Sequence, residues 1–164
     1  MSTSTQTGSP HSGRVKVISI LVIVAGAILA AAGVVTYALV STTLSDQQIT
    51  VADDARWSAG AHVDQPWEAY AQADIIGTHA NEIAGGKTYA ELPQDDPNRD
   101  TVMQASFLQA SLFTSVVAFG VALMAVGLGI VLILVGAALH AVGRSLKAVA
   151  GAPRTPDSAA PATS

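Results

Sequence analysis

The chain has 164 residues, of which half are hydrophobic and only 12% are charged, against about 25% charged residues in an ordinary globular domain. Its formal net charge of −4 gives no indication of a nucleic-acid partner. The sequence contains no cysteine, which excludes disulfides, thiolate metal sites and a cysteine nucleophile.

The first predicted elements are a tail and a membrane span. Most of residues 1–16 are Ser, Thr, Gly and other small or polar residues, which have few apolar side chains to bury. We therefore expect a disordered tail here. Residues 17–40 follow Arg14 and Lys16 and carry no charge. As a helix this run would extend about 36 Å at ~1.5 Å per residue, enough to cross a bilayer with some tilt. We predict the first transmembrane helix here.

The same run has an alternative interpretation as a cleaved signal peptide. Basic residues precede its apolar core, and "LAAAG" supplies the small residues that cleavage needs. A signal core usually has only ~7–15 residues, whereas this run continues past Gly33 as far as Val40. We favour an uncleaved span. The alternative is a secreted protein with a cleaved signal and one C-terminal anchor.

Residues 41–110 carry most of the acidic side chains and are expected to form a mostly helical cap. The stretch "DQPWEAYAQADIIGTHANEIAGG" predicts a helix, because Pro66 suits a first helical position and two glycines suit its end. Large side chains recur along one stripe of it, which predicts packing. The candidate contact residues are Trp67, Tyr70, Ile75 and Ile83. Upstream, "QITV" at residues 48–51 leans towards β structure but is ambiguous.

The polar stretch at residues 81–100 predicts a turn-rich connection. Thr88 and Glu91 have the spacing of a capping box. Asp96 followed by Pro97 predicts the start of a helix that continues into the second apolar run. We therefore interpret this stretch as the hinge between the cap and the second span.

The second transmembrane helix is predicted at residues 111–141, and residues 142–164 as a largely disordered tail. Five of the eight Lys and Arg residues lie outside the two spans, near their ends, while residues 41–110 hold three. The positive-inside rule therefore predicts a multi-pass protein of the cell membrane, with both termini cytoplasmic and residues 41–110 outside.

Both spans carry small residues at helical spacing. Such residues let helix backbones approach closely within a membrane, so the pattern predicts a helix hairpin. The candidate packing residues are Gly26, Ala30, Gly33, Ala118, Ala122, Ala125, Gly129 and Gly136. Neither span contains a charged residue, which disfavours a transporter or channel acting alone.

Chemical motifs are weak. A His₂-carboxylate iron site can be drawn from His62 and His79 with Glu68 or Glu82, but these spacings match no strong motif. We expect solvated polar residues instead, with the His79 ring packed along the helix stripe. We predict no catalytic residue, no cofactor and no metal.

The segments "ITV.DDA", "GGKTYAEL" and "DDP.R.TVMQASFLQASLFTSVVAFGV" resemble a family of small two-span actinobacterial membrane proteins. The similarity covers about residues 17–140. Members often bear the label aromatic ring-opening dioxygenase. The resemblance implies a membrane location and a two-span architecture, and it carries over no catalytic residues.

Together these observations predict an all-α membrane protein in which two transmembrane helices form a hairpin below a mostly helical extracytoplasmic cap. The predicted function is non-enzymatic, as an accessory or interaction protein of the cell envelope. Its expected partners are the lipid bilayer and another membrane or envelope protein or itself, with no nucleic acid. The alternative is a subunit of an aromatic ring-opening dioxygenase, as the family label suggests.

Overall fold

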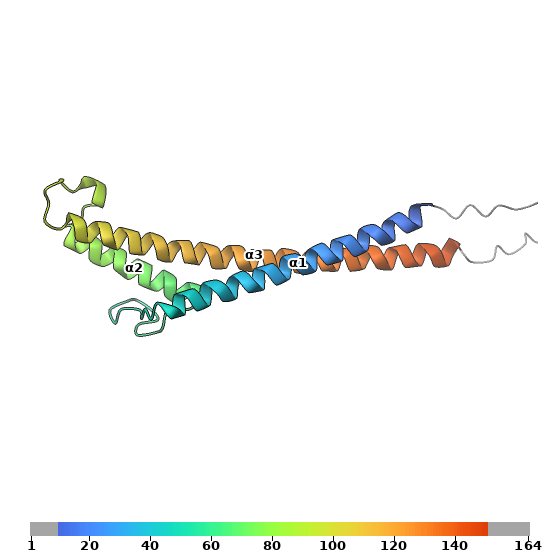
Figure 1. The fold of residues 1–164 in the computed structure, drawn as a ribbon, viewed down its shortest axis with the longest axis horizontal. Coiled ribbons are helices and arrows are strands. Elements are labelled where there is room, and N and C mark those ends of the chain that lie inside the picture. Colours follow the sequence, from blue (N-terminus) through green and yellow to red (C-terminus); the bar gives the residue numbers. More distant parts are fainter. Residues whose placement is uncertain (1–9, 151–164) are drawn as a thin grey trace, which may run out of the picture. The chain divides into compact units, whose positions relative to one another are not determined.

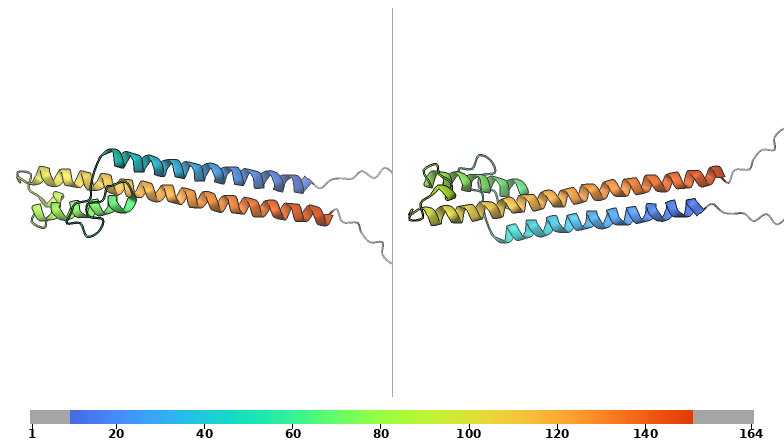
Figure 2. Two further views of the ribbon diagram at one scale, coloured as in Figure 1. Left: turned by 90° about the horizontal axis from the view of Figure 1, so that it is seen from below. Right: turned by 90° about the horizontal axis from the view of Figure 1, so that it is seen from above.

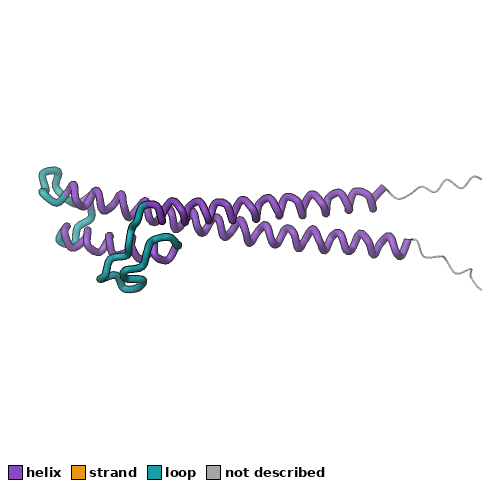
Figure 3. The backbone as a smooth tube through the Cα atoms, turned by 60° about the horizontal axis from the view of Figure 1, so that its bottom comes forward, coloured by secondary structure: helices purple, strands orange, loops and turns teal. Residues whose placement is uncertain are grey.

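The computed structural model describes the backbone of residues 10–150 and the side chains of residues 13–145. Within that range all regular secondary structure is helical. No β-strand is present there, and the only β pairing is one isolated bridge (Figures 1 and 3). This confirms the all-α prediction. The elements are α1 (Pro10–Asp46), α2 (Pro66–Ile83), the short 3₁₀ helix η1 (Tyr89–Glu91) and α3 (Arg99–Ala150).

Two of these helices, α1 and α3, are long and apolar enough to cross a membrane. Both extend beyond the predicted spans, so residues 10–16 are helical rather than disordered, and α3 continues to Ala150. The helices extend past the apolar runs because Pro10 suits a first helical position and no proline interrupts α3 before its end. The rest of the predicted disordered tails, residues 1–9 and 151–164, lies outside the described residues.

The chain divides into two compact units. Unit 1 combines the first part of α1, up to Ile28, with the part of α3 that begins at Gly129. Unit 2 is residues 29–128 and holds the rest of both helices together with the segment between them, residues 47–98.

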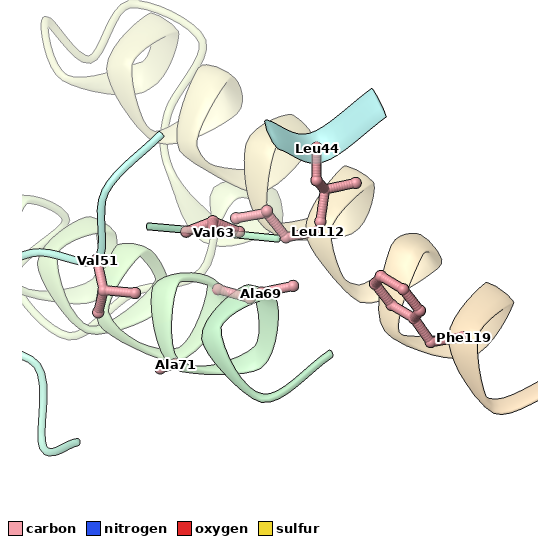
Figure 4. Packing of buried hydrophobic residues seen from close by; sticks show 8 residues of the cluster. Leu44, Val51, Val63, Ala69, Ala71, Leu112 and Phe119 are labelled. Atoms are coloured by element: carbon pink, nitrogen blue, oxygen red, sulfur yellow. The ribbon is translucent and has the colours of Figure 1, made fainter. Parts of the chain in front are cut away.

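In unit 2, α2 packs antiparallel against the beginning of α3 (Figure 2). The Gln109 side chain donates to the Ala73 carbonyl over 3.2 Å, and the Asn98 side chain donates to the Ile83 carbonyl over 3.3 Å. The unit has a side-chain core drawn from α1, the following loop, α2 and α3 (Figure 4). Its buried members are Leu44, Val51, Val63, Ala69, Ala71, Ala73, Leu112 and Phe119.

The loop between α1 and α2 folds back on itself. Thr50 and His62 form the isolated antiparallel bridge, so the β-leaning "QITV" contributes one bridge and not a strand. Val51 donates its N–H to the Ala61 carbonyl, and Ala52 donates to the Gln72 side chain of α2, both over 2.9 Å. These bonds bring Val51 and Val63 into the core, where they are 1% and 0% exposed.

The connection from α2 to α3 agrees with most of what its sequence predicts. Gly85 and Gly86 adopt φ of +61° and +84° and end α2, as predicted, because glycine reaches this region without strain. The capping box is confirmed: the Glu91 carboxylate accepts the N–H and the hydroxyl of Thr88, both at 2.8 Å. The Asp96 carboxylate accepts the Asn98 N–H instead of capping α3 directly. The helix therefore begins at Arg99, two residues later than predicted.

Candidate functional site

The predicted small-residue face forms a close helix contact. The buried residues of α1 include Ser19, Gly26 and Gly33, which are seven residues apart. Ala122, Gly129 and Gly136 repeat this interval on α3. A seven-residue repeat is typical of helices that pack with a slight left-handed crossing, since it corresponds to 3.5 residues per turn.

At three of these positions only glycine fits without a shift. In unit 2, a Cβ placed on Gly33 would lie 2.6 Å from the Ala122 carbonyl oxygen. In unit 1, a Cβ on Gly26 would lie 2.7 Å from the Gly129 carbonyl oxygen, and one on Gly136 would lie 2.9 Å from the Ser19 carbonyl oxygen. The helices therefore touch through their backbones, as small residues permit in a membrane.

The remaining predicted packing residues lie at the margins of this contact. Ala30, Ala118 and Ala125 are half-buried, whereas Ala122 is 1% exposed. Ala118 also lines an apolar groove of about 240 Å³ in unit 2, together with Leu39, Leu44 and Thr114. The glycines and Ala122 therefore form the centre of the contact, and the other predicted alanines lie beside it.

An aromatic contact in unit 2 joins α1, α3 and the start of α2. The rings of Tyr37 and Phe119 lie 4.7 Å apart between centroids, and Phe119 is fully buried. The Tyr37 hydroxyl donates to the Gln65 side-chain oxygen over 2.5 Å. Gln65 immediately precedes α2, so this bond ties the first turn of α2 to α1.

The predicted contact residues of α2 separate into two groups. Ile75 is buried at 8% exposure, whereas Trp67, Tyr70 and Ile83 are 55%, 43% and 45% exposed. The buried face of α2 consists mainly of alanines, which allow its backbone to approach the core. The four residues were predicted from their large side chains. Three of the four side chains are exposed.

Two further aromatic residues were missed by the sequence analysis. Trp57 stacks on Tyr70 with centroids 5.9 Å apart and an interplanar angle of 15°. Tyr70 in turn meets Phe113 edge-on at 5.6 Å. Trp57 is 41% exposed, so this aromatic row begins at the surface of unit 2 and ends on α3. No local pattern links these residues, because they come from three separate segments.

The histidines occupy separate places and serve local contacts. His62 Nε2 faces the Ser45 carbonyl at 3.3 Å. His79 does not pack along the helix stripe as expected; its Nε2 lies 2.7 Å from Asp54 Oδ2. The hydrogen bond from His79 lowers the pKa of the Asp54 carboxyl. Within the described residues no group of three or more His, Asp or Glu side chains is placed to hold a metal ion.

Unit 2 also has a small polar cavity of about 160 Å³ beside α2 and η1. Hydroxyl, amide and ammonium groups line it, including those of Asn81, Lys87, Thr88, Ser106 and Gln109. Elsewhere in the unit, one carboxylate oxygen of Glu68 is buried without a hydrogen-bond partner among the described atoms. The cavity lining suits hydrogen bonding to water or a small polar solute.

Comparisons of the chain with protein-family models, with curated proteins and with solved structures give no match. The resemblance of residues 17–140 to small two-span membrane proteins therefore stays a prediction. The proposed function rests on the residues and contacts described above.

Proposed function

We propose that the chain is an integral membrane protein whose two apolar helices cross the bilayer as a hairpin and carry residues 41–110 as an extracytoplasmic cap. The observation that supports this most is the exposure of large apolar side chains along α1 and α3. Leu21, Leu39 and Leu134 are 61%, 61% and 63% exposed. Only 17% of the most apolar window of each helix is buried by protein. Apolar surface of this extent needs lipid or another apolar partner.

The proposed orientation follows from charge. Arg14, Lys16 and Arg144 flank the apolar runs at one end of each helix, and eleven of the twelve acidic residues fall within residues 41–110. Basic residues near the ends of spans favour the cytoplasmic side. Both termini would then lie in the cytoplasm.

Membrane insertion and orientation have direct tests. We expect the full chain to stay with the membrane pellet after alkaline carbonate extraction. A reporter fused at Thr3 should give a cytoplasmic signal, and one fused at Gln94 an external signal. Release by carbonate would disprove the insertion, whereas a cytoplasmic signal from position 94 would disprove only the orientation.

We further propose that the cap serves interaction, as an accessory protein of the cell envelope that presents a surface to another membrane or envelope protein or to a second copy. Phe107 and Leu108 of α3 support this, because they are 65% and 54% exposed. They precede Leu112, the residue that shares the core with Leu44 near the end of α1. Adjacent large apolar residues exposed among polar neighbours, here Gln104 and Ser111, are typical of a protein contact.

A photocrosslinking residue at position 107 tests this interaction. Position 104 is the matched control, because Gln104 is exposed one turn earlier on the same helix. We expect a discrete adduct from position 107 in intact cells, a weaker one from position 104, and loss of the first on Leu108→Asp. Equal labelling at both positions, or no adduct at 107, would contradict an interaction at this surface.

A further inference from the structure

The residues at which the apolar runs would leave the hydrocarbon can be counted from the ends nearest the termini, taken as Val17, which follows Lys16, and Leu139, which precedes His140. Roughly 20 helical residues cross the hydrocarbon core of a bilayer. Counting from Val17 reaches Thr36 on α1, and counting back from Leu139 reaches Gly120 on α3. The adjacent residues, Tyr37 and Phe119, have ring centroids 4.7 Å apart. Both counts thus end beside the same contact, and the outer hydrocarbon boundary would lie there. The outer ends of the two predicted spans, residues 37–40 and 111–119, would then lie beyond the hydrocarbon.

The start of α2 is fixed at this level. Gln65 accepts the hydrogen bond of the Tyr37 hydroxyl at 2.5 Å, and α2 begins at the next residue. Trp67 lies only two residues further, a rise of about 3 Å along the helix. Its side chain is 55% exposed. A large aromatic residue is therefore held, uncovered by the chain itself, close to the boundary.

The exposed face of α2 changes character along its length. Positions 67, 70, 74, 78 and 81 share one face, because they are three or four residues apart. The first two are Trp67 and Tyr70, and the others are Asp74, Thr78 and Asn81. Trp57 stacks on Tyr70, and Phe113 meets Tyr70 six residues before Phe119 on α3, or about 9 Å along that helix. Aromatic side chains are thus gathered at one end of this face, and polar side chains follow.

We infer that the first turn of α2 lies in the headgroup region of the same bilayer that α1 and α3 cross, with Trp67 as its anchor. Trp and Tyr are favoured at membrane–water interfaces, where the ring meets apolar material and the polar group stays hydrated. Trp57 stacks on Tyr70, which lies three residues, or about 4.5 Å, further along α2 than Trp67. This inference rests on the proposed membrane insertion, and it assigns the base of the cap to lipid and not to a protein partner.

Anchoring at this point has a consequence for the cap. Phe107 lies twelve residues before Phe119 on α3, so it would stand about 18 Å beyond the hydrocarbon boundary at ~1.5 Å per residue. The lipid contact at Trp67 and the exposed pair at Phe107 and Leu108 are then separate surfaces. The first would hold the cap against the bilayer, and the second would stay free for a partner.

Fluorescence quenching of the two tryptophans tests the inference, because the chain has no others. The full-length Trp57→Phe and Trp67→Phe variants, each with one tryptophan left, would be reconstituted in phosphatidylcholine vesicles. We expect lipids brominated near the carbonyl end of the acyl chain to cause a larger loss of fluorescence at Trp67 than at Trp57. Bromination near the methyl end should quench Trp67 less, and aqueous iodide should quench Trp57 more than Trp67.

The contrary outcomes are distinct. A Trp67 that is open to iodide and insensitive to brominated lipid would overturn the inference. A Trp67 shielded from both would also overturn it and would indicate that a second copy of the chain covers the site. If either occurs while the chain resists carbonate extraction, membrane insertion stands and only the interfacial contact fails. Release of the chain by carbonate would instead disprove the proposed membrane insertion.

The Tyr37→Phe variant tests how α2 is held at this level. It removes the hydroxyl bound to Gln65, and the matched control is Thr36→Val, which removes a neighbouring hydroxyl bound only to the Ala32 carbonyl of α1. With Trp67 as the single tryptophan, we expect Tyr37→Phe to increase iodide quenching and decrease quenching by brominated lipid, and Thr36→Val to change neither. Equal effects of the two variants would contradict a positioning role for the Tyr37 hydroxyl.

Discussion

The contacts inside unit 1 differ in kind from the contacts inside unit 2. Among the residues of unit 1 whose side chains are described, the buried ones are Ser19, Gly26, Gly129 and Gly136, and helix backbone meets helix backbone. In unit 2, large side chains such as Val63 and Leu112 are enclosed by a loop and three helices. Among the described residues, every buried large apolar side chain belongs to unit 2.

This difference has a physical reason under the proposed membrane insertion. Between helices in lipid, burying a leucine against protein gains little, because lipid tails are as apolar as leucine. Close backbone contact through glycine then supplies the attraction. In water, burial of apolar area stabilises a fold by about 25 cal/mol per Å², so large side chains collect in a core. Four substitutions or conditions would sharpen this comparison, in order of expected effect.

The largest effect is expected from Leu112→Ala in the core of unit 2. Leu112 is 7% exposed, and its truncation should cost about 2–5 kcal/mol through lost burial and the remaining cavity. Leu108→Ala is the matched control, since it makes the same change one turn earlier at 54% exposure and should cost less than about 0.5 kcal/mol. Denaturant unfolding in one detergent measures both. Similar losses would mean that the core of unit 2 is not what stabilises it.

The next effect concerns the glycine contact. Gly136→Leu should destabilise the helix pair by about 1–3 kcal/mol, because its side chain would meet Ile23 and the Ser19 carbonyl. Gly127→Leu is the control, since nothing lies within 4 Å of a Cβ placed there. Thermal unfolding followed by circular dichroism would compare them. If Gly127→Leu is as unstable as Gly136→Leu, the lost stability comes from replacing any glycine of the helix by leucine and not from the contact at Gly136.

A smaller effect is expected at the hinge between η1 and α3. The Arg99 guanidinium lies 4.3 Å from the centre of the Tyr89 ring and donates to the carbonyls of Tyr89 and Leu92. Arg99→Lys keeps the charge but loses the planar fork, so we expect a loss of about 1 kcal/mol. Hydrogen exchange at Val102 should accelerate. Unchanged exchange there would show that charge alone holds the hinge.

The smallest effect is expected on acidification. The Thr88 N–H and hydroxyl lower the pKa of Glu91 from its ordinary 4.5, and the His79 hydrogen bond lowers the pKa of Asp54 from 3.8. A lowered folded pKa means that the stabilisation is present above the ordinary value and is lost as pH falls through the folded value. Below about pH 4.5 we expect weaker protection of the Thr88 amide against exchange, measured relative to the intrinsic rate at each pH. Glu91→Gln should abolish the pH dependence of amide protection at Thr88. It should leave the pH dependence that comes from the Asp54–His79 pair unchanged.

Local sequence signals predicted much of the fold because their causes are local. Pro66, Gly85 and the Thr88–Glu91 capping box act through φ preferences and hydrogen bonds within a few residues, and each is confirmed. The start of α3 was displaced by two residues because Asp96 used its carboxylate in a turn. The small-residue spacing is also a local signal, and three of the glycines it indicated lie where a Cβ would meet the other helix.

The arrangement of side chains around α2 was not predictable in this way. Size and spacing indicated Trp67 and Ile83 as residues of cap packing or contact. Both are exposed, and alanines form most of the buried face of α2. The Asp54–His79 pair and the Trp57–Tyr70 stack join residues 25 and 13 positions apart, so no periodic pattern shows them. They depend on how the loop at residues 47–65 folds back.

The sequence by itself determined the three α-helices, their turns and the two charge-free apolar runs, because these follow from residue-by-residue backbone preference and hydropathy. The tertiary structure decided that glycines form the closest helix contacts and that Tyr37 binds Gln65. It also decided that the tryptophans of the segment between α1 and α3 are exposed. Those outcomes depend on which distant backbones approach one another, and that approach is set by packing of the whole unit.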